Sequence, residues 1–148
     1  MDHREDRVGE QRPLRGARAT MDYASNDINT LTSQVIGAAI EVHRHLGSGF
    51  LESVYETALC FELAERGLRF SRQHPISVEY KGQSVGEGRL DFLVEGRLVV
   101  ELKAVEQLHN IHVAQVISYL KATQLSFGLL MNFNVKVLKD GIRRIVLD

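Results

Sequence analysis

Charged side chains that could bind a divalent cation and a phosphate lie close together between residues 89 and 103. This stretch reads as two short alternating strands, with Asp91 on the first and Glu101 and Lys103 on the second. Carboxylates are the hard oxygen ligands that Mg²⁺ and Mn²⁺ prefer. A lysine beside them can position a water molecule or stabilise charge on a phosphate. The residue types are therefore the minimum equipment for metal-dependent cleavage of a phosphodiester.

The length of the connection between these strands decides whether the two carboxylates meet. A two-residue turn at Glu95-Gly96 would set Asp91 opposite Val100. A three-residue connection, residues 95–97, sets Asp91 opposite Glu101 and gathers apolar residues on the other face, so we predict this second register. Its apolar pairs are Leu90 with Leu102, Phe92 with Val100 and Val94 with Leu98, and its charged face carries Arg89, Asp91, Glu101 and Lys103. Opposed carboxylates repel unless a cation or proton lies between them, although charges on a surface hairpin can also simply face water.

A second motif lies upstream, in residues 49–55, which read Gly-Phe-Leu-Glu-Ser-Val-Tyr. It resembles the motif that names the GxxExxY proteins, and residues 40–49 are also similar to that family. The resemblance runs from about Leu31 to the C-terminus. Since this family is similar to a branch of the PD-(D/E)xK nuclease superfamily, the resemblance implies an α/β fold. That fold is restriction-endonuclease-like, with a mixed central β-sheet flanked by α-helices.

The resemblance also implies roles for individual residues. Asp91 and Glu101-Leu102-Lys103 match the superfamily signature, although the proline that often precedes the signature Asp is Leu90 here. Glu52 matches the acidic residue of the first core helix. The implied ligands of Mg²⁺ or Mn²⁺ are Glu52, Asp91, Glu101 and the Leu102 carbonyl, and the implied catalytic residues are Asp91, Glu101 and Lys103.

Supporting positions follow from the same resemblance. Gln115 and Tyr119 match a Gln-x-x-x-Tyr element, and their four-residue spacing places them on one side of a helix. They could orient Lys103, a water or a phosphate, or they could be ordinary helix-surface polarity. Tyr55 and His43 belong to the family pattern and could support the site.

Several elements must position these residues. We predict helices over residues 29–46, 50–66 and 110–122 from their apolar periodicity and from Gly47 and Gly67 as stops. Alternating and apolar runs predict strands over residues 76–80, 84–94, 98–104, 127–133 and 143–147, with turns at 81–83 and 139–141. Glu52 falls on or beside the apolar stripe of the second helix, where a carboxylate needs a partner or must reach water from the stripe's edge.

Composition restricts the class of protein. The 148 residues suffice for one domain, and the chain has no apolar run near 18 residues, so we expect no membrane association. The net charge of −1 gives no general attraction for nucleic acid, so contacts with DNA must come from local clusters or the clusters are solvated surface. These are Arg66, Arg69 and Arg72, and Lys136, Lys139, Arg143 and Arg144. The single cysteine, Cys60, excludes an internal disulfide and a thiolate zinc site, and is typical of a cytoplasmic protein.

Residues 1–26 are polar and contain five arginines, and we interpret them as a disordered tail before a domain at residues 27–148. The family resemblance begins after Met21, so translation could start there. The histidines do not predict a zinc site, since His43 and His45 point to different sides of a helix and His109 and His112 lack a third ligand. Packing or capping explains them better.

The sequence therefore predicts a nuclease that acts on DNA in preference to RNA. Two other classes remain open at this point. One is a nucleic-acid-binding module that retains the fold without turnover, because fold alone does not establish activity. The other is a structural or regulatory interaction protein with a protein partner or as a homodimer.

Overall fold

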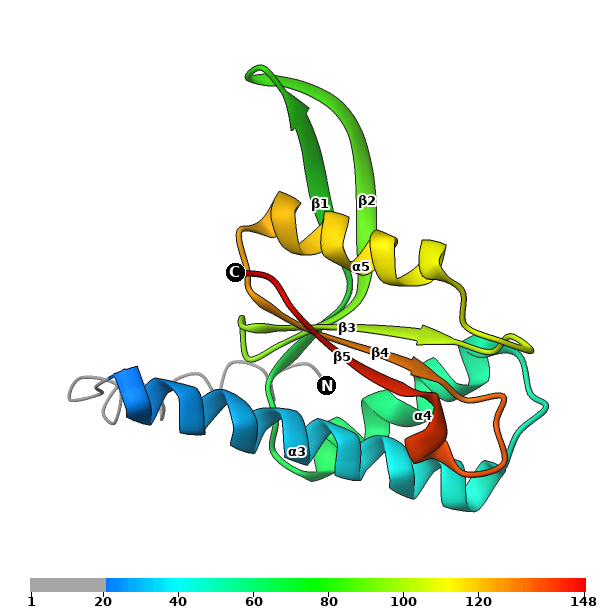
Figure 1. Ribbon diagram of the computed structural model, residues 1–148. Coiled ribbons are helices and arrows are strands. Elements are labelled where there is room, and N and C mark those ends of the chain that lie inside the picture. The colour runs from blue at the N-terminus through cyan, green and yellow to red at the C-terminus, as the bar shows by residue number, and fades with distance from the viewer. Residues whose placement is uncertain (1–20) are drawn as a thin grey trace.

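The computed structural model describes the backbone of residues 21–148 and the side chains of residues 27–148. Five strands form one mixed sheet in the order β1-β2-β3-β4-β5, with helices on both faces (Figure 1), which confirms the predicted fold class. The strands are β1 Phe70–Tyr80, β2 Gln83–Val94, β3 Leu98–Lys103, β4 Phe127–Asn132 and β5 Ile142–Val146.

Two helices cover one face of the sheet and a third covers the other (Figure 1). Helices α3 (Met21–Leu46) and α4 (Glu52–Glu65) pack side by side, while α5 (Asn110–Thr123) links β3 to β4 across the opposite face. A 3-10 turn, η1 (Leu138–Gly141), leads into β5. Because β3 and β4 pair in parallel, the chain must cross the sheet between them, and α5 is that crossover.

The first helix begins earlier than the predicted start at residue 29. Ile28 is buried, and Asp27 forms an ion pair with Arg97 in the β2–β3 connection, so tertiary contacts extend the helix before its expected cap. Of the predicted tail at residues 1–26, residues 1–20 lie outside the described residues, whereas residues 21–26 belong to α3. The first strand also starts earlier than predicted, at Phe70, and the remaining elements agree with prediction to within two residues at each end.

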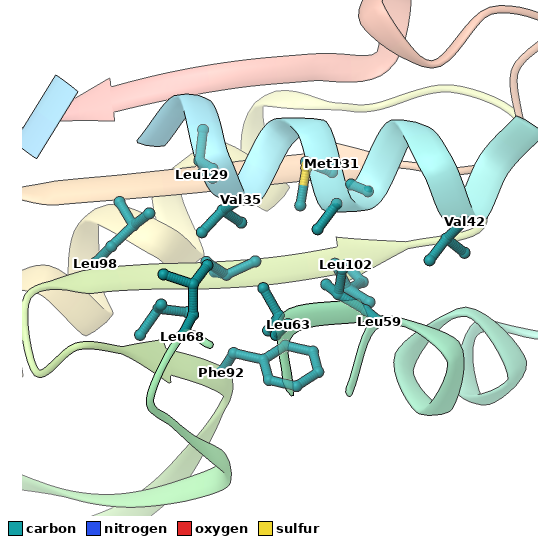
Figure 2. Packing of buried hydrophobic residues seen from close by; sticks show 14 of the residues in the cluster. Val35, Val42, Leu59, Leu63, Leu68, Phe92, Leu98, Leu102, Leu129 and Met131 are labelled. Atoms are coloured by element: carbon teal, nitrogen blue, oxygen red, sulfur yellow. The ribbon is translucent and has the colours of Figure 1, made fainter. Parts of the chain in front are cut away.

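The larger apolar core lies between the sheet and the α3–α4 layer (Figure 2). Val35 of α3, Leu63 of α4, and Phe92 and Leu102 of the sheet are fully buried there. Burying a side chain of this size contributes about 1.5–3 kcal/mol. Leu102 stands between Glu101 and Lys103, so this core fixes the strand that carries both charges.

A second apolar cluster joins α5 to the other face of the sheet. It contains Val116 and Leu120 of α5, with Leu90 and Val99 from the strands. The helix approaches β4 closely at Gly128, where an added Cβ would lie 2.9 Å from Val116 Cγ1. This contact sets the height of α5 above the sheet, and hence the position of Gln115 and Tyr119. No helix in the described part of the chain is both long and apolar enough to cross a membrane.

The outer halves of β1 and β2 form an arm that projects beyond the sheet (Figure 1). Lys81 and Gly82 make its two-residue turn, between the paired residues Tyr80 and Gln83. At its base the arm turns away from β3, and this is where the charged residues of the predicted site are found.

Candidate active site

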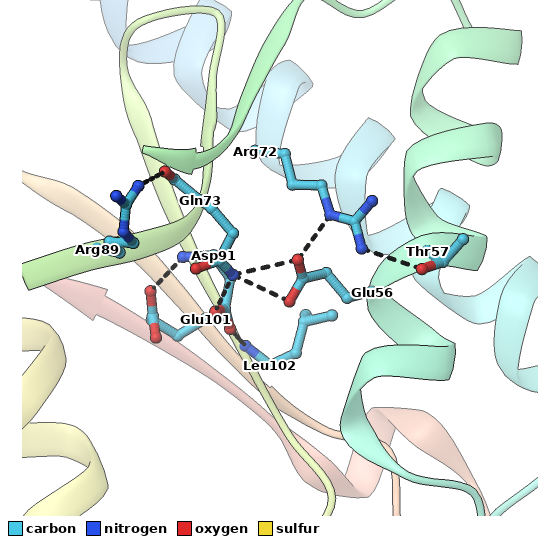
Figure 3. A network of polar contacts seen from close by, with 8 residues as sticks. All are labelled: Glu56, Thr57, Arg72, Gln73, Arg89, Asp91, Glu101 and Leu102. Carbon is cyan, nitrogen blue, oxygen red and sulfur yellow. Dashed lines mark hydrogen bonds and ion pairs between the residues drawn. The ribbon is translucent and has the colours of Figure 1, made fainter. Parts of the chain in front are cut away.

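Strands β2 and β3 separate at the point where the sequence places its carboxylates. Their paired residues are Phe92–Val100, Leu93–Val99 and Val94–Leu98. Beyond Phe92, side chains take over from the backbone: Asp91 N donates to Glu101 Oε2 at 2.8 Å, and Leu102 N donates to Asp91 Oδ2 at 2.8 Å. Each carboxylate therefore accepts a hydrogen bond from the other strand, which holds the two side chains close together at the opening (Figure 3).

The pairing confirms the predicted register, with residues 95–97 as a three-residue connection. The alternative that set Asp91 opposite Val100 is wrong. Phe92 and Val100 are fully buried together in the α3–α4 core, as expected. The prediction that Leu90 and Leu102 share one apolar face is wrong. Leu90 packs in the α5 cluster, whereas Leu102 packs in the α3–α4 core. The face that Leu90 occupies changes because β2 twists away from β3 at Asp91.

Glu101 is the most deeply placed of the carboxylates, with 4% of its surface exposed. Burial raises the pKa of Glu101 to about 8, and the negative charge of Asp91 contributes in the same direction. The hydrogen bond from Asp91 N and the positive charge of Lys103 oppose this rise. The Glu101 carboxyl group therefore keeps its proton over most of the range below pH 8.

Burial and neighbouring negative charges also raise the pKa of Asp91 and of Glu52. Burial raises the pKa of Asp91, against the hydrogen bond from Leu102 N, and the charge of Glu56 raises it further. Burial also raises the pKa of Glu52, in the first turn of α4, followed by the charge of Asp91. Since Glu52 and Asp91 influence each other electrostatically, helix α4 delivers its acidic residue to the opening between β2 and β3.

Lys103 brings the positive charge of this group. It lies two residues beyond Glu101 on the same face of β3, because side chains alternate along a strand. Its charge lowers the pKa of all three carboxyl groups, Glu52, Asp91 and Glu101, against the larger effect of burial. The Lys103 ammonium group thus lies among three acids whose ionisation burial disfavours.

The three acids and the lysine therefore meet at the end of the central strand β3, with Glu52 supplied by α4. Residues 29–145 match the family model of the PD-(D/E)XK nuclease superfamily. The chain belongs to this superfamily. No curated protein and no solved structure was found to match it. The family match covers α4, β1 to β4, α5 and β5 up to Ile145, and so includes Glu52, Asp91, Glu101 and Lys103.

Nucleases of the PD-(D/E)XK superfamily generally use divalent metal ions. The donor set here fits such an ion, because buried carboxylate oxygens that repel one another are hard ligands whose repulsion a cation relieves. In the described residues, however, no three His, Cys, Asp or Glu side chains are already arranged to hold a metal. The Asp91 and Glu101 carboxylates instead accept hydrogen bonds from the backbone N–H groups of Leu102 and Asp91, respectively. Leu102 contacts the site through its backbone N–H, which donates to Asp91 Oδ2.

Sequence reasoning missed three further residues beside this superfamily site. Glu56, one turn after Glu52, is buried and accepts hydrogen bonds from Arg72 at 2.7 Å and from Gln73 at 3.1 Å. Gln73 also donates to Asp91 Oδ1 at 3.3 Å. The available signal was Glu56 itself, a carboxylate on the apolar side of α4. Arg72 and Gln73 precede the predicted strand at residues 76–80, and Arg72 was considered only as part of a basic cluster.

Gln115 and Tyr119 lie on α5, facing the same opening. Burial raises the pKa of Tyr119, and the charges of Glu101 and Asp91 raise it further, whereas a hydrogen bond with Gln115 lowers it. The Tyr119 ring also lies against the base of the arm, where a Cβ added to Gly88 would be 3.5 Å from its Cε1 atom. Tyr119 is therefore close enough to Glu101 and Asp91 to feel their charge, and Gln115 is connected to these acids through Tyr119.

Tyr55 and His43 form hydrogen bonds that join elements of the fold. The Tyr55 hydroxyl donates to Gly47 O at 2.6 Å and accepts from Phe50 N at 3.1 Å, so it ties the α3–α4 loop to α4. His43 Nε2 contacts Val135 O at 2.8 Å, which joins α3 to the segment after β4. His109 and His112 cap the start of α5, where His109 N donates to His112 Nδ1 at 2.9 Å.

The two predicted basic clusters differ in their partners. Arg66, Arg69 and Arg72 each pair with a carboxylate, of Glu62, Glu95 and Glu56 respectively. Their charge is largely neutralised, which leaves little for a phosphate. Lys136, Lys139, Arg143 and Arg144 are exposed around η1 and β5.

Proposed function

We propose that this protein is a divalent-metal-dependent nuclease that hydrolyses phosphodiester bonds in DNA, in preference to RNA. The observation that carries the proposal is the convergence of Glu52, Asp91 and Glu101 around Lys103, with the pKa of all three acids raised. Perturbed acids beside a cation are typical of a catalytic site rather than of a solvated hairpin. Membership of the nuclease superfamily supports the same reaction class.

In this proposal Glu52, Asp91 and Glu101, with the Leu102 carbonyl, hold Mg²⁺ or Mn²⁺. A bound cation would polarise a phosphoryl oxygen and lower the pKa of water. Binding requires the acids to be ionised, so it competes with the protons that burial favours. It also requires Asp91 or Glu101 to offer oxygen lone pairs that the backbone N–H groups do not use.

Lys103 acts on the phosphate in this proposal. A lysine ammonium has three N–H donors and one full charge, which suits a phosphate on which negative charge develops during cleavage. Gln115 and Tyr119 border the same opening and orient Lys103 or the phosphate. Tyr55 and His43 support the reaction only through the fold, by holding α3, α4 and the α3–α4 loop.

Nucleic acid is the substrate class that this chemistry implies, and the exposed basic residues around η1 and β5 are a surface that phosphates can reach. Affinity from so few charges is modest, so a protein partner or homodimer could add to it. We further place the chain in the GxxExxY branch, on the motif at residues 49–55, and in the cytoplasm, on its single cysteine.

The test is cleavage of labelled single-stranded, duplex, flapped and junction DNA and of matching RNA, with Mg²⁺, Mn²⁺ or a chelator. We expect cleavage that needs the metal and is lost in Glu52→Gln. The matched control is Glu62→Gln on the same helix, which removes a carboxylate that pairs with Arg66. Glu62→Gln should cleave like the wild type.

Other outcomes separate the remaining classes. Binding of an oligonucleotide without cleavage by any metal would indicate a binding module on the nuclease fold. Binding of neither metal nor oligonucleotide would indicate an interaction protein, and the nuclease proposal would then be abandoned.

A further inference from the structure

Gln73 occupies a strained position near the middle of β1. Its backbone φ is 51°, in the left-handed region that residues other than glycine rarely adopt. Glycine would accept this conformation without strain. Strain of this kind persists where the surrounding structure enforces it, and it gathers at functional sites. The side chain of Gln73 therefore needs an explanation.

The strained backbone brings two consecutive side chains to one partner. Neighbouring residues of a regular strand point to opposite faces of the sheet. Here Arg72 Nε donates to Glu56 Oε2 at 2.7 Å, and Gln73 Nε2 lies 3.1 Å from both Glu56 oxygens. Arg89 Nη1, from the paired strand, donates to Gln73 O at 2.9 Å and holds the strained peptide in place (Figure 3).

The same amide reaches the predicted site. Gln73 Nε2 donates to Asp91 Oδ1 at 3.3 Å, while Leu102 N donates to Asp91 Oδ2 at 2.8 Å. Each oxygen of Asp91 thereby accepts a hydrogen bond, one from β1 and one from β3. Each carboxylate oxygen has two acceptor positions, so lone pairs remain for a further ligand. Glu56 in turn is held by Arg72, and the four side chains form one chain of contacts from α4 to β2.

We propose that Gln73 is a positioning residue: its amide links Glu56 to Asp91 and fixes the orientation in which the Asp91 carboxylate meets its ligand. This inference rests on the proposed nuclease function and adds a residue to it from a strand that carries none of the signature. Groups that orient a metal ligand without touching the metal commonly change affinity or activity by about 10–100-fold when removed.

The test is Gln73→Gly, which removes the amide and relieves the backbone strain, so the fold should survive. We expect Mn²⁺ affinity, measured by titration calorimetry, to fall about tenfold or more. The kcat for oligonucleotide cleavage should fall while KM changes little, because Gln73 faces the acids rather than the substrate. Gln83→Gly, at the tip of the same arm, is the matched control and should behave like the wild type.

A second variant, Gln73→Asn, keeps an amide and tolerates the left-handed conformation, but it is one methylene too short to bridge Glu56 and Asp91. It should resemble Gln73→Gly. If both variants bind Mn²⁺ and cleave like an active wild type, the positioning role is overturned and the nuclease function stands. If both fail to fold, Gln73 is structural and the inference is equally overturned. If the wild type neither binds Mn²⁺ nor cleaves, the nuclease function fails first and the inference fails with it.

Discussion

The two halves of β3 differ in what satisfies their hydrogen bonds. Leu98, Val99 and Val100 pair with β2 on one side and β4 on the other, and all three are buried. Glu101 to Lys103 keep the pairing with β4 but lose the ladder to β2. On that side the carboxylates of Asp91 and Glu101 accept the bonds that backbone carbonyls accept elsewhere.

This difference explains why charges are found in so central a place. A buried backbone N–H without a partner costs about 1–3 kcal/mol, so opening the sheet at Asp91 and Leu102 requires new acceptors. Carboxylates provide them, but burial then raises the pKa of both acids. The first half of β3 serves stability alone. In the second half, the groups that complete the fold are also those proposed for chemistry.

Leu102→Ala is the sharpest test of the difference between the two halves of β3. Leu102 belongs to the half that carries the charges, but its side chain faces the core. Leu102 is fully buried, so truncation should lower the free energy of unfolding by about 2–5 kcal/mol. Its neighbour Glu101→Gln should leave the metal-free protein as stable or slightly more stable, since it removes a buried charge. Urea denaturation at pH 8 measures both. A large loss for Glu101→Gln with none for Leu102→Ala would reverse the assignment of the two faces.

The next largest effect is expected for Lys103→Ala. The loss of a charge that faces the developing phosphate charge should slow cleavage by about 10²–10³-fold. Mn²⁺ binding should be retained, because the removed group is a cation and not a ligand. Single-turnover cleavage and calorimetry measure the two properties, with Lys121→Ala on α5 as the control. Loss of Mn²⁺ binding in Lys103→Ala would show instead that the lysine maintains the site's structure.

A smaller effect concerns pH. The pKa of Glu101 is raised from 4.5 to about 8 in the folded protein, so between these values the native state holds a proton that the unfolded state releases. The free energy of unfolding should therefore fall as pH rises from about 5 to 8, by on the order of 3 kcal/mol. Glu101→Gln should reduce this slope, and saturating Mn²⁺ should offset the loss at pH 8. A wild-type protein whose stability is flat over this range would mean that Glu101 titrates normally.

The sequence was sufficient to predict the register, and with it the closeness of Asp91 and Glu101, for a physical reason. A three-residue connection and alternating side chains leave a single arrangement that buries Phe92 with Val100, and that arrangement brings Asp91 near Glu101. It was not sufficient for Leu90, because the alternation rule assumes a strand that stays in its sheet. Here β2 follows β1 into the arm and twists at Asp91, a tertiary effect with no local signal.

The contribution of β1 was missed for a related reason. Arg72 and Gln73 sit in a polar stretch ahead of Pro75, which does not read as a strand. Pro75 is tolerated because β1 is an edge strand. The left-handed backbone of Gln73 then turns its side chain toward Glu56 and Asp91, and periodicity cannot forecast that direction. The residues that hold the acids were therefore harder to find than the acids themselves.

The smallest predicted effect tests whether the Tyr119 hydroxyl on α5 contributes to cleavage. Tyr119→Phe keeps the ring that lies against Gly88 and removes only the hydroxyl, so stability should change by less than about 0.5 kcal/mol. Cleavage at saturating Mn²⁺ should fall by no more than about tenfold, the value of roughly one hydrogen bond. Tyr80→Phe, an exposed tyrosine at the arm's tip, is the control. A loss as large as that of Lys103→Ala would place the Tyr119 hydroxyl in the reaction itself. If Tyr119→Phe cleaves as fast as the wild type, the reaction depends only on the acids and the lysine at the point where β2 and β3 separate.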